Sequence, residues 1–178
     1  MQLRRALAVV VLLASASCED RKTVHESAAT PAARALDLRA RETGALPDRE
    51  RVDPAGIYQR RYEGGGDRLC LVPEGEGGKR FTFGAETRFG GEEYCLGRGK
   101  ARLAGDKLLL TFEGGASSCV IVAGYEGDRI VMPGSVDVSC AALCSGRGSF
   151  SGASFPRLRQ EKGREQSLKG GDGQPLCR

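Results

Sequence analysis

Six cysteines in the last two thirds of this 178-residue chain constrain its fold more than any other feature. A small domain this rich in cysteine usually has a modest hydrophobic core and relies on disulfides for part of its stability. The six are Cys70, Cys95, Cys119, Cys140, Cys144 and Cys177, while a seventh cysteine, Cys18, stands apart near the N-terminus. The six predict three disulfides, and disulfides predict an oxidising compartment.

The pairing of these cysteines is open, because six cysteines allow fifteen connectivities. Cys140 and Cys144 would lie one turn apart in a helix, a geometry that fits a disulfide poorly, so each is expected to bond elsewhere. Our working assignment joins Cys70 to Cys95, Cys119 to Cys140, and Cys144 to Cys177.

Zinc binding and redox chemistry are the alternative uses of these thiols. Zinc ligands usually come as two close pairs, whereas this chain has one close pair and a single histidine, His25, outside that region. A thioredoxin-type centre needs Cys-x-x-Cys, which does not occur. We therefore expect no metal and no other cofactor, and we interpret His25 as a solvated linker residue.

Residues 1–17 have the pattern of an export signal. Arg4 and Arg5 precede an apolar run over residues 6–13, and small residues follow. The run is about half of the roughly 20 residues that a membrane-spanning helix needs, so no permanent transmembrane helix is expected. Removing the two arginines lowers the formal net charge from +4 to about +2. Such a small charge predicts no nucleic-acid partner.

The residues Ser15-Ala16-Ser17-Cys18 resemble the lipobox of bacterial lipoproteins, in which the cysteine becomes the acylated first residue of the mature protein. Most members carry leucine where this chain has Ser15, so cleavage near Ala16 or Ser17 without lipidation stays open. The resemblance implies a palmitate-type lipid anchor at Cys18 that holds the protein to the bacterial envelope, facing the periplasm. The alternative is a soluble periplasmic or secreted protein.

The rest of the chain divides into a tether, a β-domain and a tail. Residues 18–53 are polar, and Thr30-Pro31 predicts the start of a short helix over residues 32–41 that ends near Gly44. The β-domain is expected over residues 54–155, and Cys177 would tie back a tail over residues 156–178. Expected strands cover residues 57–62, 68–72, 80–84, 100–103, 107–112, 119–123, 129–132 and 149–154.

These short, turn-bounded strands predict an all-β fold, a small antiparallel β-barrel or sandwich stapled by disulfides. Three Gly-Asp pairs, Gly66-Asp67, Gly105-Asp106 and Gly127-Asp128, are interpreted as tight turns and not as catalytic acids. Alternation within the strands predicts the core. The expected core residues are Ile57, Leu69, Leu71, Phe81, Phe83, Leu103, Leu108, Leu110, Phe112, Cys119, Ile121, Ala123, Val131 and Phe150.

Motifs for catalysis and nucleotide binding are missing. The glycine-rich segments 97–102 and 146–151 match neither the dinucleotide fingerprint nor a Walker loop, and Gly-x-Ser-x-Gly does not occur. A serine or cysteine nucleophile would also lack a histidine base within the domain. Carboxylates alone suffice for glycan hydrolysis, but the neighbours Glu92 and Glu93 would point to opposite faces of a strand or, in a loop, would simply be solvated.

Arg98, Lys100 and Arg102, here called the cationic stripe, are the most distinctive surface feature. Their spacing of two places three cations on one face of a strand, where they would receive an anionic partner. The plainer interpretation is a charged edge strand that prevents sheet-to-sheet aggregation. Three tyrosines are interpreted as half-buried sheet residues, with an exposed binding surface as the alternative. They are Tyr58, Tyr62 and Tyr94.

Residues 140–152, Cys-Ala-Ala-Leu-Cys-Ser-Gly-Arg-Gly-Ser-Phe-Ser-Gly, follow several strands with single cysteines and resemble a group of small exported bacterial proteins of unassigned function. More distantly, the size, lipobox and β-rich domain resemble periplasmic lysozyme-inhibitor lipoproteins, which are compact β-barrels. Their inhibitory-loop motif is absent, so no functional residue carries over.

The resulting expectation is a non-catalytic envelope lipoprotein that binds or inhibits an envelope protein or a cell-wall ligand. The alternatives are an envelope enzyme that acts on cell-wall glycan through carboxylates, and a structural or assembly lipoprotein.

Overall fold

The computed structural model describes residues 30–49, 52–75, 77–90, 92–114, 119–159 and 165–177. The expected signal segment, the lipidation site Cys18 and His25 lie outside these residues. The chain divides into two units, residues 1–46 and residues 47–178.

The first unit contains helix α2 (Pro31–Glu42), which confirms the helix predicted for the tether. Thr30 caps it, because the Thr30 Oγ1 atom accepts a hydrogen bond from the Ala33 N–H at 3.2 Å. Gly44, with a φ of 75°, follows the helix as expected. Among the described residues, no helix is both long enough and apolar enough to span a bilayer.

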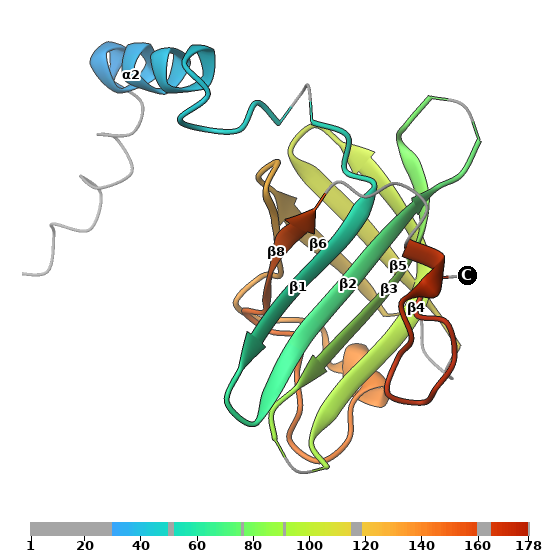
Figure 1. Cartoon of the computed structure of the whole chain (residues 1–178). Helices are drawn as coiled ribbons and strands as arrows, with labels where there is room; N and C mark the ends of the chain where they lie inside the picture. The colour runs from blue at the N-terminus through green and yellow to red at the C-terminus, as the bar shows by residue number, and fades with distance from the viewer. Residues whose placement is uncertain are drawn as a thin grey trace, which may run out of the picture. The chain divides into compact units, whose positions relative to one another are not determined.

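The second unit is a closed antiparallel barrel of eight strands (Figure 1). Each strand pairs with its neighbour in sequence, and β8 pairs back with β1. The strands are β1 (Gly56–Tyr62), β2 (Gly65–Pro73), β3 (Arg80–Arg88), β4 (Tyr94–Ala104), β5 (Lys107–Glu113), β6 (Val120–Tyr125), β7 (Arg129–Val131) and β8 (Ser154–Arg159). The all-β prediction is confirmed, and of the two expected architectures the chain adopts the barrel.

One strand prediction and one turn prediction are wrong in position. The strand expected over residues 149–154 lies instead at Ser154–Arg159, past the expected end of the β-domain at residue 155. Phe150 misled the prediction because it is buried from a loop, where its ring stacks on Phe112 with centroids 5.4 Å apart. The pair Gly66-Asp67 also lies inside β2, while the turn falls at residues 63–64, where Gly64 has a φ of 78°.

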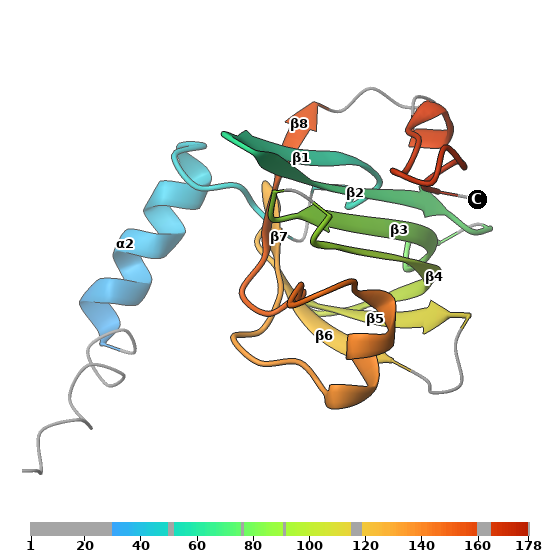
Figure 2. The ribbon, with the colours of Figure 1, turned by 90° about the horizontal axis from the view of Figure 1, so that it is seen from below.

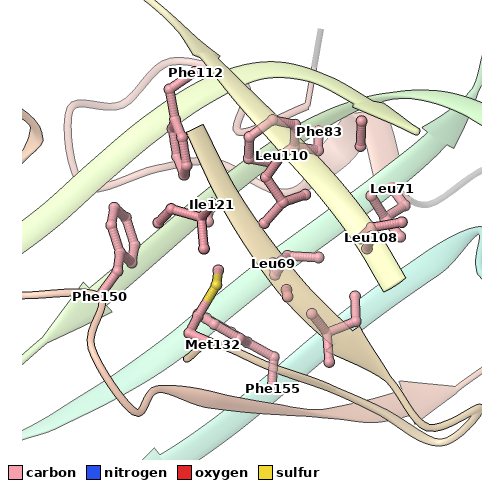
Figure 3. Packing of buried hydrophobic residues seen from close by; sticks show 14 of the residues in the cluster. Leu69, Leu71, Phe83, Leu108, Leu110, Phe112, Ile121, Met132, Phe150 and Phe155 are labelled. Carbon is pink, nitrogen blue, oxygen red and sulfur yellow. The ribbon is translucent and has the colours of Figure 1, made fainter. Parts of the chain in front are cut away.

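Side chains fill the barrel interior (Figure 3). Phe83, for example, meets Phe112 edge-on with ring centroids 4.8 Å apart. Most of the expected core is confirmed, but Tyr58 and Ile130 are buried where Ile57 and Val131 were expected, since a shift of one residue exchanges the two faces of a strand. Leu103 is only partly buried. Because the interior is packed, a ligand site has to lie at a barrel end or on the outer wall.

The three expected disulfides are present, but two of the assigned pairings are wrong. Cys119 bonds Cys140 as assigned, whereas Cys70 bonds Cys177 and Cys95 bonds Cys144. Cys70 packs with Leu176 in a cluster separate from the main core, while Cys95 belongs to the main core, and β3 separates their strands. A Cys70–Cys95 bond is therefore geometrically excluded. The expectation that Cys140 and Cys144 bond elsewhere is confirmed.

Residues 132–153, here called the plug, lie at the end of the barrel where β1 turns into β2, which we call the hairpin end (Figures 1 and 2). The plug contains the 3₁₀ helix η1 (Val138–Leu143) and carries both Cys140 and Cys144. Their disulfides tie the plug to residues that flank β6 and begin β4. The hairpin end is thus covered by a loop held in place by two covalent bonds.

The opposite end, where residues 52–55 lead into β1, is closed by a polar cluster around Arg157. The Arg157 guanidinium donates to the Ala55 carbonyl oxygen at 3.1 Å and to the Asp53 carbonyl oxygen at 2.6 Å. It also donates to the hydroxyl oxygens of Tyr58 at 2.7 Å and Tyr125 at 3.3 Å. Tyr125 in turn donates to the Val52 carbonyl oxygen at 2.9 Å, so the entering chain is held across this end.

The C-terminal segment, residues 165–177, begins with the 3₁₀ helix η2 (Glu165–Ser167) and covers the outer wall of β2, β3 and β4 (Figure 1). Leu176 and the Cys70–Cys177 disulfide are buried there, which confirms that Cys177 ties the tail back. Beneath the segment, the buried Glu86 carboxylate accepts hydrogen bonds from Arg68 at 2.7 Å and Arg88 at 2.6 Å.

Candidate functional site

A pocket of about 570 Å³ opens at the hairpin end and is here called the mouth pocket. Its volume falls within the range of about 300–1,000 Å³ that small-molecule sites occupy. Its lining comes from β1, β2, the turn after β3 and the plug, and consists of Arg60, Tyr62, Asp67, Phe89, Ser151, Gly152 and Ala153.

Strand pairing brings the polar side chains of the mouth pocket together. Arg60 in β1 lies directly opposite Asp67 in β2, and Tyr62 lies opposite Gly65. Because side chains alternate along a strand, Asp67 shares the inner face of β2 with the buried Leu69. Arg60 and Asp67 therefore belong to the last inward-facing layer of β1 and β2, which is polar where the layers below are apolar.

Asp67 and Arg60 form an ion pair with very different exposure. Arg60 Nη2 lies 3.2 Å from Asp67 Oδ2, and the side chains are 51% and 3% exposed respectively. Burial raises the pKa of the Asp67 carboxyl above its ordinary value, while hydrogen bonding from Tyr62 and the charge of Arg60 partly offset this rise. Asp67 is thus a buried anchor that holds an exposed guanidinium at the rim.

Tyr62 connects the ion pair to the neighbouring hairpin. Its hydroxyl lies 3.1 Å from Asp67 Oδ1 and 2.5 Å from the Arg88 carbonyl oxygen, and its single proton serves one acceptor at a time. Burial raises the pKa of the Tyr62 hydroxyl, and the neighbouring Asp67 carboxylate raises it further. The tyrosine is therefore protonated at neutral pH and acts as a hydrogen-bond donor.

Two aromatic rings remain accessible at the mouth pocket. Tyr62 is 38% exposed and Phe89 is 47% exposed, and they come from two different hairpins. The Arg60 guanidinium carbon lies 5.3 Å from the centre of the Tyr62 ring, which is within cation–π distance. The mouth pocket therefore combines apolar ring surface with a held guanidinium.

Thr87 lies next to Asp67 in the register between β2 and β3 and is fully buried. Its hydroxyl has no hydrogen-bond partner among the described residues.

The described part of the chain also contains no cluster of three or more histidine, cysteine or carboxylate side chains that would hold a metal ion.

The cationic stripe lies on the outer face of β4, as its spacing predicted, but two of its cations, Arg98 and Lys100, have internal partners. Arg98 donates to Asp172 Oδ1 at 2.9 Å and to the Pro175 carbonyl oxygen at 2.8 Å, and Lys100 pairs with Glu74. The edge-strand interpretation is wrong, because β4 pairs with β3 and β5 inside a closed barrel. Arg98 serves instead to hold the C-terminal segment.

The other candidate side chains are dispersed. Glu93 lies 3.6 Å from Arg147, and neither Glu92 nor Glu93 lines the mouth pocket. Of the three tyrosines, Tyr58 is fully buried, whereas Tyr62 and Tyr94 are each 38% exposed. Tyr94 lines a separate open groove beside Arg98 and Lys100.

Arg60, Asp67 and Phe89 were not predicted as site residues from the sequence. The signal for Asp67 was present, because it alternates with the core residues Leu69 and Leu71, but the preceding glycine suggested a turn. The run Gly64-Gly65-Gly66 allowed the turn to be placed three residues too late. Phe89 carries no local pattern, since its role depends on how two hairpins meet.

Comparison with known proteins gives no relative: no protein-family model matches the chain, and no curated protein or solved structure is significantly similar to it. The site is therefore interpreted from its geometry alone.

Proposed function

We propose that this protein is a lipid-anchored envelope protein that binds its partner without chemical conversion, through the mouth pocket. Its three disulfides indicate an oxidising, extracytoplasmic location. Lipidation at Cys18 is supported by the signal pattern and the lipobox-like residues before it. The polar segment that follows would serve as a tether between the membrane and the barrel.

The contrast between the two barrel ends carries this proposal. One end is closed by Arg157 and the chain that enters β1, whereas the other leaves a pocket in which a guanidinium, a carboxylate and two rings converge. A few polar groups within an otherwise apolar concavity are typical of binding sites. The two disulfides of the plug would keep this site preformed, which lowers the entropic cost of binding.

The carboxylates favour binding over glycan hydrolysis. Glycosidases ordinarily place two carboxyl groups about 5–9.5 Å apart across the scissile bond. Among the described residues that line the mouth pocket, Asp67 is the one carboxylate, and it already accepts from Arg60 and Tyr62. A role as an inhibitor is one form of this binding function.

Site-specific crosslinking in the bacterial envelope tests the proposal. A photoreactive phenylalanine analogue at Phe89 should capture a specific envelope component, whereas the same analogue at Val122, 52% exposed on β6, should not. Equal capture at both positions, or none at Phe89, would contradict a binding site at the mouth. The intact mass of the membrane-extracted protein tests the anchor: an unmodified Cys18 would make this a soluble exported protein.

A further inference from the structure

The mouth pocket has balanced charge, which bears on the ligand it accepts. Arg60 and Asp67 neutralise each other across the β1–β2 pair, 3.2 Å apart. The nearby Arg88 is engaged on the outer wall by Glu86, 2.6 Å away. A charged ligand would have to compete with these internal partners and would leave a buried charge without its counterion, which is costly. The charge pattern therefore favours a neutral ligand.

The hydrogen-bonding groups of the mouth pocket favour a ligand rich in hydroxyls. A guanidinium carries five N–H donors, and Asp67 engages the Nη2 side of Arg60, so further donors at this half-exposed side chain remain for a ligand. Ser151 adds a hydroxyl from the plug, and this hydroxyl lies 2.8 Å from that of Ser149. A serine hydroxyl can both donate and accept a hydrogen bond. A hydroxyl of the ligand can likewise accept from the arginine and donate to the serine.

The exposed rings supply the apolar half of the site. Tyr62 and Phe89 present flat surfaces with negative faces, and such faces attract polarised C–H groups as well as cations. A pyranose ring combines an apolar C–H face with a hydroxyl-bearing edge. A bound pyranose would place its C–H face against an aromatic ring and its hydroxyl-bearing edge toward Arg60 and Ser151.

From these features we propose that the mouth pocket binds a neutral saccharide, with Phe89 as the stacking surface and Arg60 as the principal hydrogen-bond donor. This inference rests on the proposed function and specifies the ligand of the same site. In it Asp67 is a positioning residue, because it holds Arg60 from a buried position. The volume of about 570 Å³ accommodates a short oligosaccharide.

Titration of the full-length, disulfide-oxidised protein with defined trisaccharides tests the ligand class. The neutral probes are triacetylchitotriose, cellotriose and maltotriose. Their binding is measured by calorimetry and saturation-transfer NMR. At least one should bind with a Kd of about 1 mM or tighter. The matched charged probes are deacetylated chitotriose, a cation, and trigalacturonic acid, an anion. Each should bind at least about tenfold more weakly than the preferred neutral probe.

Variants locate the binding. Phe89→Ala should weaken the preferred saccharide about tenfold, while Phe89→Tyr, which keeps the ring, should retain affinity. Tyr94→Ala is the matched control, because Tyr94 is likewise an exposed aromatic residue, at 38% against 47% for Phe89, but lies outside the mouth pocket. The proposal is overturned if no neutral trisaccharide binds, if the charged probes bind equally well, or if Phe89→Ala has no effect.

The failure of this inference is distinguishable from failure of the proposed function. If the analogue at Phe89 captures an envelope protein while every trisaccharide fails to bind, the mouth is a protein-binding site and the saccharide assignment falls alone. If neither experiment yields a ligand, both fall together.

Discussion

Gly65 lies directly opposite Tyr62 at the end of the β1–β2 hairpin, and its missing side chain makes room for the tyrosine ring. A Cβ atom at Gly65 would lie 2.8 Å from the Tyr62 ring and 2.1 Å from the Arg88 carbonyl oxygen. The position of Tyr62 at the mouth pocket therefore depends on a glycine across the strand pair.

We expect Gly65→Ala to destabilise the barrel by about 1–3 kcal/mol, because the added methyl group would push against backbone that cannot move freely. Thermal unfolding measures the effect. Gly124→Ala in β6 is the control, since a Cβ there would lie 3.8 Å from its nearest neighbour, the Val131 carbonyl oxygen. Equal effects at both positions would show that general strand propensity, and not the contact at the mouth, decides the cost.

Arg157→Lys should destabilise the closed end by about 2 kcal/mol or more, since a lysine cannot replace a guanidinium that reaches two carbonyls and two hydroxyls at once. Hydrogen exchange at residues 52–55 should rise along with the loss in unfolding free energy. Arg102→Lys, at an exposed position on β4, should change stability by less than about 0.5 kcal/mol. Unchanged exchange at residues 52–55 would refute the role of Arg157 in closing this end.

Alternation predicted much of the barrel because the apolar residues of several strands face one packed interior. Leu108, Leu110 and Phe112 illustrate this, since each occupies the buried position of β5 that the pattern indicates. Phe150 shows the limit of the rule: it is buried as predicted, yet from a loop. A pattern of burial reports which side chains face the core and leaves open whether the backbone that carries them is paired.

The disulfide pairing and the mouth pocket depend on three-dimensional register, which local patterns do not encode. Cys70 lies between the inward-facing Leu69 and Leu71 and therefore faces outward, whereas Cys95 faces inward from a part of β4 that precedes the strand expected over residues 100–103. The glycine run at residues 64–66 concealed Asp67, because it permits more than one position for the turn. The early start of β4 thus hid the orientation of Cys95, and the position of one turn hid the candidate site.

The loop closed by each disulfide predicts an order of stabilities. Cys70–Cys177 spans 107 residues and Cys119–Cys140 spans 21. If restriction of the unfolded chain dominates, removing the first bond should cost about 4–5 kcal/mol and removing the second about 3 kcal/mol. Denaturant unfolding of the two Cys→Ser double variants measures this, with Cys→Ala variants as a check on the buried hydroxyls. The reverse order would show that anchoring the plug matters more than loop length.

The raised pKa of Asp67 predicts how stability depends on pH. A carboxyl whose pKa is higher in the folded state binds more protons there than in the unfolded chain, where its pKa is about 3.9. The stabilising contribution of Asp67 to folding is therefore full below the unfolded-state pKa and is lost as the pH rises through the folded-state pKa. Asn at this position does not titrate, so the unfolding free energy of the wild type relative to Asp67→Asn should fall as the pH rises from about 4.

Asp172→Asn is the control of opposite sign for this pH series. The hydrogen bond from Arg98 lowers the pKa of the Asp172 carboxyl, so its contribution is present at neutral pH and is lost as the pH falls through its folded-state pKa. Denaturant unfolding of the three proteins at successive pH values separates the two trends. If the wild type gained stability over Asp67→Asn with rising pH, the attraction of Arg60 would outweigh burial. The ionised Asp67 would then stabilise the folded state through its pair with Arg60, and the polar layer at the mouth would contribute to folding.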